Sequence, residues 1–123
     1  MIEIRKAIAA HGLWKVKLKE VVSSGNPGGL QPVAVGRHDG CEFGRWLLGI
    51  PPQVRASPHF AEVQRVHADF HRAAAEVLVL TVSRKPEEAL RAMDTGQFAT
   101  CSARLILLLT EWERELESLG QAA

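Results

Sequence analysis

The sequence FAEVQRVHADFHRAAAEVLVLT occupies residues 60–81. Apolar side chains recur in it at spacings of three and four, which predicts an amphipathic helix with one buried face. Ser57 and Pro58 precede it as an N-cap and as a proline suited to the first helical position. The predicted buried face consists of Phe60, Val63, His67, Phe70, Ala74, Val77 and Thr81. A histidine therefore stands where this helix should present an apolar side chain to a core.

The same spacing recurs on both sides of this segment. It predicts long helices over about 3–22 and about 97–119, and shorter ones at 41–49 and 86–93. The stretch at about 23–40 is expected to be an irregular loop, because glycine and proline follow the first helix closely. A loop of this length in a small domain is typical of a functional or mobile segment.

These elements predict an all-α fold, an antiparallel four-helix-type bundle with an additional short helix that carries Cys41. The length of 123 residues suits a single domain, 1–123. The formal net charge is +1, from 15 basic and 14 acidic residues, which argues against a nucleic-acid partner. No apolar run approaches the roughly 18 residues that cross a membrane, and no signal peptide opens the chain. We therefore expect a cytoplasmic domain without membrane insertion.

Three histidines lie on predicted buried faces: His11 in the first helix, and His67 and His71 one turn apart in the long one. A buried imidazole needs partners for both ring nitrogens. For any one of these histidines, a backbone carbonyl or a water is a sufficient partner. Three such histidines together with Cys41 at a helix start favour metal ligation. The helix dipole is expected to favour the Cys41 thiolate. Three nitrogens and one sulfur suit tetrahedral zinc, so His11, Cys41, His67 and His71 are predicted to bind one Zn²⁺ per chain.

Several neighbours of these residues are expected to pack around the metal. Trp14 and Trp46 are predicted to cover the site, and Phe43 to lie in the core. Gly44 interrupts the short helix with a residue that weakens helices, which indicates that another element approaches closely there.

Other polar residues near the motifs have two interpretations each. Asp39 and Asp69 either orient a ligand imidazole or are solvated at the surface. His38 is either a substitute ligand or a solvated loop residue, and His59 is expected to be exposed or to cap a helix. Cys101 falls on the apolar face of the last helix, which favours a small buried core residue.

Three motifs combine in this chain: His11-x-x-Trp14, Cys41-x-Phe43-Gly44-x-Trp46 and His67-x-x-x-His71. The combination resembles the chemoreceptor zinc-binding (CZB) domain family over about residues 7–74. The resemblance implies a helical bundle in which His11, Cys41, His67 and His71 are the zinc ligands.

The resemblance also implies bacterial cytoplasmic signalling, in chemotaxis or cyclic-di-GMP control, and a homodimer. Family members are attached to chemoreceptors or diguanylate cyclases, and neither kind of domain is present in these 123 residues. The chain is therefore expected to be either an excised sensor module or a free-standing one with a separate signalling protein as partner. The outward position of Leu13 on the first helix is a candidate dimer contact.

An enzyme is not expected, because four protein ligands leave no place on zinc for a reactive water. Two cues remain open for a sensor: the availability of zinc, or oxidation of Cys41 towards sulfenate, for example by hypochlorous acid. In both, Cys41 is the ligand predicted to switch, and for oxidation it is the redox-switch candidate. The alternative is a structural zinc ion that stabilises a dimerisation module with no sensing role.

Overall fold

The structure is a computed structural model that describes residues 2–120, apart from the side chain of Ile2. The described part is helical and contains no strand, which confirms the all-α prediction. Its long helices are α1 (Ile2–Ser24), α5 (Phe60–Val82) and α7 (Gln97–Ser118). The shorter elements are α2 (Pro32–Val35), the 3₁₀ turn η1 (His38–Gly40), α3 (Glu42–Leu48), α4 (Pro52–Arg55) and α6 (Pro86–Asp94).

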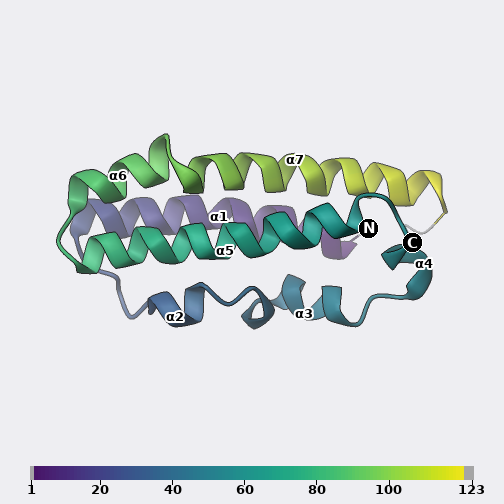
Figure 1. Cartoon of the computed structure of the whole chain (residues 1–123), viewed down its shortest axis with the longest axis horizontal. Helices are drawn as coiled ribbons and strands as arrows, with labels where there is room; N and C mark the ends of the chain where they lie inside the picture. The colour runs from purple at the N-terminus through teal and green to yellow at the C-terminus, as the bar shows by residue number, and fades with distance from the viewer. Residues whose placement is uncertain (1, 121–123) are drawn as a thin grey trace.

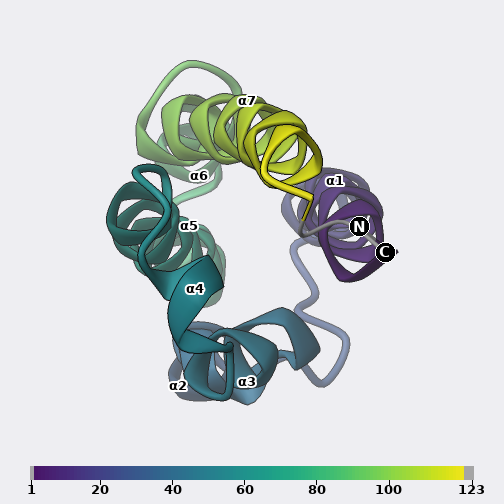
Figure 2. The same ribbon diagram turned by 90° about the vertical axis from the view of Figure 1, so that its right-hand side faces the viewer.

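The helices form the four sides of an elongated bundle (Figures 1 and 2). Helices α1 and α5 run in one direction, whereas α6 and α7 follow one another in the opposite direction along a third side (Figure 1). The fourth side consists of α2, η1 and α3, which also run opposite to α1. The short helix predicted after Cys41 is α3, and it lies on this fourth side.

The predicted apolar faces meet in one core. Ile4 and Leu18 of α1, Val63 and Phe70 of α5, and Trp112 of α7 are all fully buried. Helix α1 ends at Ser24, and Gly25 follows it with a positive φ of 71°, a conformation that favours glycine. Helix α5 thus buries all the residues that the spacing pattern selected for its core face. None of the described helices is long and apolar enough to cross a membrane.

The segment expected to be an irregular loop, 23–40, is partly helical. Pro32 occupies the first turn of α2, where its missing N–H is not needed, and Val35 at the end of α2 is buried. The expectation of an irregular stretch was wrong here because a four-residue helix is too short to show a period. The prediction of a single domain over 1–123 stays a prediction.

Side chains of α7 hold the ends of the bundle to α1 and α5. The Arg5 guanidinium lies 2.9 Å from a Glu113 carboxylate oxygen, which agrees with the opposite directions of α1 and α7. His59, at the start of α5, pairs with Glu115 and lies 3.4 Å from Glu111. Its side chain does not cap α5, so the expectation that His59 is exposed or capping is wrong: it bridges two helices.

Candidate metal centre

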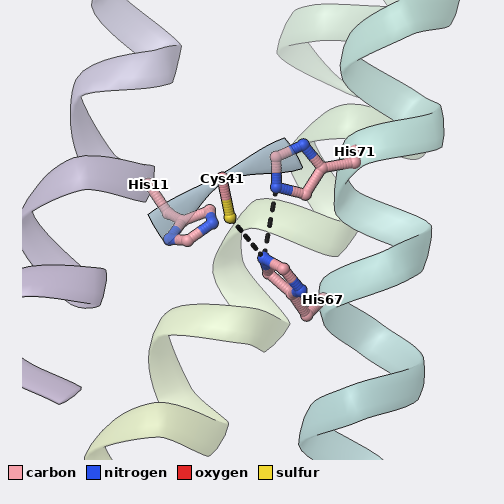
Figure 3. Close-up of side chains that lie close together, drawn as sticks. All are labelled: His11, Cys41, His67 and His71. Atoms are coloured by element: carbon pink, nitrogen blue, oxygen red, sulfur yellow. Dashed lines mark hydrogen bonds between the residues drawn. The ribbon is translucent and has the colours of Figure 1, made fainter. Parts of the chain in front are cut away.

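Four predicted ligands converge inside the bundle (Figure 3). His11 comes from α1, Cys41 is the N-cap of α3, and His67 and His71 come from α5. One ligand atom from each lies within 4.8 Å of the other three. His67 Nε2 is 3.3 Å from Cys41 Sγ and 3.2 Å from His71 Nε2. Segments far apart in the sequence therefore meet at one point.

Backbone carbonyls orient two of the imidazoles. His11 Nδ1 lies 2.7 Å from the carbonyl oxygen of Ala7, and His71 Nδ1 lies 2.9 Å from that of Val35. An N–H at Nδ1 donates to each carbonyl, so Nε2 carries the lone pair and faces the cluster. These two partners are backbone groups, which a search for carboxylate side chains does not detect.

The two aspartates considered as orienting groups lie elsewhere. Asp39 pairs with Arg37 at 3.3 Å, and Asp69 pairs with Arg72 and, at 3.7 Å, with Arg65. No contact between either carboxylate and a ligand imidazole is found among the described residues. Both aspartates thus form ion pairs with arginines, as their alternative interpretation as surface residues implies.

Aromatic rings surround the cluster. The ring of Phe43 is 5.1 Å from that of His67, and Trp46 stacks on Phe43 at 5.6 Å. Phe70, which the sequence identified only as a core residue, lies 5.0 Å from His11. Trp14 is half-buried beside a cavity of about 240 Å³ between α1 and α3. Apolar rings thus exclude water from the side of the cluster that faces the core.

Gly44 is required by a close backbone approach. A Cβ at this position would lie 1.7 Å from the carbonyl oxygen of His38, a distance that no side chain tolerates. The approaching element is the η1 turn, which the sequence did not predict. The same turn is tied to the cluster, since Cys41 Sγ donates to the His38 carbonyl oxygen at 3.5 Å. The same sulfur accepts a hydrogen bond from the Gly44 N–H at 3.3 Å.

Burial dominates the electrostatics of the cluster. It lowers the pKa of His67 to about 2 and that of His11 to about 4, and it also lowers the pKa of His71. Burial raises the pKa of the Cys41 thiol, against the lowering effect of the Gly44 amide. The expected preference for the thiolate is therefore wrong for the metal-free protein. A metal ion must displace this proton in order to bind the sulfur.

The lowered histidine pKa values predict that the metal-free protein loses stability in acid. Below pH 6.5 the unfolded chain protonates both His11 and His67, whereas the folded chain keeps them neutral down to about pH 4 for His11 and about pH 2 for His67. Unfolding then takes up protons, so the free energy of unfolding falls as the pH falls below 6.5. We expect a loss on the order of 2 kcal/mol for each histidine at pH 5.

Urea unfolding of chelator-treated protein at pH 7.5 and pH 5 measures this loss. The variant His67→Gln should lose less stability between the two values, because glutamine does not titrate. Equal stability of the unmodified chain at both values would contradict the assignment of neutral, buried imidazoles.

The residues present fit a zinc ion. Zinc bonds of about 2.0–2.1 Å to nitrogen and 2.3 Å to sulfur give ligand-to-ligand separations of roughly 3.3–3.7 Å in a tetrahedron. The two separations at His67 Nε2, 3.2 and 3.3 Å, are close to that range. His11 Nε2 is buried without a hydrogen-bond partner in the described part of the chain, a cost that ligation would remove.

A helical bundle that brings three imidazoles and one thiol to a single buried point defines a small zinc-binding domain. Comparison with protein families agrees: the profile described as "Chemoreceptor zinc-binding domain" matches residues 11–78. The match covers more than half of the chain, which therefore belongs to the chemoreceptor zinc-binding domain (CZB) family. Searches of curated proteins and of solved structures found no match. Membership identifies a signalling-related zinc-binding domain of a regulatory, not a catalytic, family.

Proposed function

We propose that this chain is a zinc-dependent regulatory module of bacterial cytoplasmic signalling. His11, Cys41, His67 and His71 bind one zinc ion, and release of Cys41 from zinc is the signalling event. The observation that carries the proposal is the origin of the four ligands. Three imidazoles come from the rigid helices α1 and α5, while Cys41 alone comes from the fourth side of the bundle. Loss of the bond to Cys41 therefore removes the attachment of the zinc ion to that side.

The accessibility of Cys41 supports its role as the switch. The three imidazoles are at most 2% exposed, whereas Cys41 is half-buried. Two cavities border it, one of about 240 Å³ between α1 and α3 and one of about 290 Å³ beside α2. An oxidant such as hypochlorous acid could reach this sulfur without unfolding the core, and oxidation towards sulfenate weakens its bond to zinc.

Cys41→Ser is the direct test. We expect the variant to stay helical but to bind zinc about 100-fold more weakly, because a neutral hydroxyl replaces a thiolate in the zinc site. A competition titration against a chromophoric zinc chelator gives the affinity. The matched control is Cys101→Ala, since Cys101 is buried in α7 and lies outside the cluster. If Cys41→Ser bound zinc as tightly as the unmodified chain, Cys41 would not be a ligand.

A permanent structural zinc ion is the second candidate. The exchange of zinc with a chelator distinguishes it from a regulatory zinc ion. A sensor should exchange zinc with a chelator and refill reversibly while most of its helices persist. A structural ion in a dimerisation module should leave only when the whole domain unfolds. Circular dichroism recorded during chelator titration separates these outcomes.

We also propose that the module is a homodimer with a separate signalling protein as its output partner. Leu13 and Val16 of α1 support the homodimer, because these two apolar side chains, one helical turn apart, are 58% and 55% exposed. An apolar pair on an outward helix face is typical of a contact surface. Analytical ultracentrifugation of Leu13→Glu should then show a monomer, while an unchanged mass would place the contact elsewhere.

A further inference from the structure

We propose that His38 is a reserve zinc ligand, which takes the place of Cys41 when the sulfur leaves the metal. The proposal rests on the proposed zinc site and adds a second state of it, with four imidazoles around the ion. Zinc then stays bound while the fourth side of the bundle changes its attachment from Cys41 to His38.

The position of His38 carries the argument. The rings of the three clustered histidines are separated by 4.7, 5.0 and 5.5 Å between centroids. The ring of His38 is 6.2 Å from that of His67, less than 1 Å beyond the largest of these separations. It approaches His67 at 82°, the edge-on arrangement that the clustered rings also adopt. His38 thus lies just outside the ligand set.

The His38 side chain is also free to move. It is exposed, and its ring forms no hydrogen bond or ion pair with the part of the chain that the structure describes. Its backbone, in contrast, is held by the close approach to Gly44 and by the contact of its carbonyl oxygen with Cys41 Sγ. Rotation of the side chain can therefore bring the imidazole towards the cluster while η1 stays near α3.

The exchange is balanced as a ligand substitution. The Cys41 sulfur leaves zinc and takes up one proton from solvent as a thiol, and the neutral His38 imidazole enters with its ring-nitrogen lone pair. Zinc keeps four ligands, but the charge of the site rises by one because a thiolate is replaced by a neutral group. We therefore expect weaker binding than in the original site, but tighter binding than with three imidazoles alone.

A set of variants tests the reserve role. In the unmodified chain, His38→Ala should change zinc affinity by less than about 2-fold, because Cys41 occupies the fourth position. In a Cys41→Ala chain, adding His38→Ala should weaken zinc binding by about 10-fold or more, since no fourth side chain remains. The matched control is Cys41→Ala with His59→Ala, because His59 belongs to the pairing with α7. This control should bind zinc as Cys41→Ala alone does.

Cobalt(II) substitution gives a readout independent of affinity. Cys41→Ala should keep the intense visible absorption of four-coordinate cobalt but lose the sulfur charge-transfer band. Adding His38→Ala should change the intensity and the pH dependence of that absorption, because a water then occupies the fourth position beside three imidazoles. Equal zinc affinities of the double variant and of the His59 control would overturn the proposal for His38. Failure of the zinc site itself is distinguishable, because the unmodified chain would then bind no zinc, or Cys41→Ala would bind it undiminished. Surface-exposed His38 tolerates alanine, and circular dichroism verifies that each variant is folded.

Discussion

Removal of zinc with a chelator is expected to loosen α2, η1 and α3 while the three long helices stay folded. If opening of this side breaks only the bond to Cys41, the open form keeps three imidazoles and binds zinc about 100-fold more weakly, so saturating zinc stabilises the closed form by about 2.7 kcal/mol. That energy corresponds to a roughly 100-fold slower exchange of backbone amides in this segment. Hydrogen–deuterium exchange followed by mass spectrometry, with and without zinc, measures it for each peptide.

The packing of the bundle explains why the effect should be local. Leu105 and Leu109 of α7 are fully buried, as are Val77 and Leu78 of α5. The fourth side contributes fewer buried apolar residues, among them Val35, Phe43 and Leu47. It therefore depends more on the metal than the long helices do. If removal of zinc accelerated exchange equally in α7 and in residues 32–48, zinc would stabilise the whole domain. If it accelerated exchange nowhere, zinc would not hold the fourth side in place.

Gly44→Ala is expected to be strongly destabilising. The added methyl group would lie 1.7 Å from the His38 carbonyl oxygen and 2.8 Å from its carbon, and both atoms belong to the backbone. Either η1 or α3 must move, which we expect to cost about 3 kcal/mol, at the upper end of overpacking. Because Cys41 lies between these two elements, zinc affinity should fall as well, by about 10-fold. Chemical denaturation and zinc titration measure the two effects.

Gly49→Ala is the matched control for this substitution. Gly49 ends the same helix with a φ of −103°, and nothing lies within 4 Å of a Cβ there. We expect this variant to keep the stability and zinc affinity of the unmodified chain to within about 1 kcal/mol. If Gly44→Ala were as stable as Gly49→Ala, η1 and α3 would not be in the contact described above.

The sequence predicts the long helices and the convergence of ligands for the same reason. Residues such as Val63, His67 and Phe70 follow one another at helical spacing, so the face that enters the core also determines which histidines enter it. This pattern is repeated over several turns, so the prediction of the buried face holds even where the predicted helix ends are wrong by a few residues. The bundle and the composition of the cluster are therefore predictable.

The fourth side of the bundle is less predictable because its elements are short. The four residues of α2 complete only one turn, and η1 is recognisable only through the glycine that it approaches, Gly44. The groups that orient His11 and His71 are carbonyls of Ala7 and Val35, which no side-chain motif encodes. Only the Ala7 carbonyl could have been anticipated, because a side chain in a helix can bond to the carbonyl four residues before it, and His11 lies four residues after Ala7.

Native mass spectrometry of protein purified without added metal or chelator tests the central claim most directly. The spectrum gives the identity of the metal, the number of ions per chain and the number of subunits. We predict one zinc ion per chain, lost on denaturation and restored by added zinc under reducing conditions. A folded, metal-free protein that takes up no zinc when reduced would contradict the assignment of His11, Cys41, His67 and His71 as a zinc site.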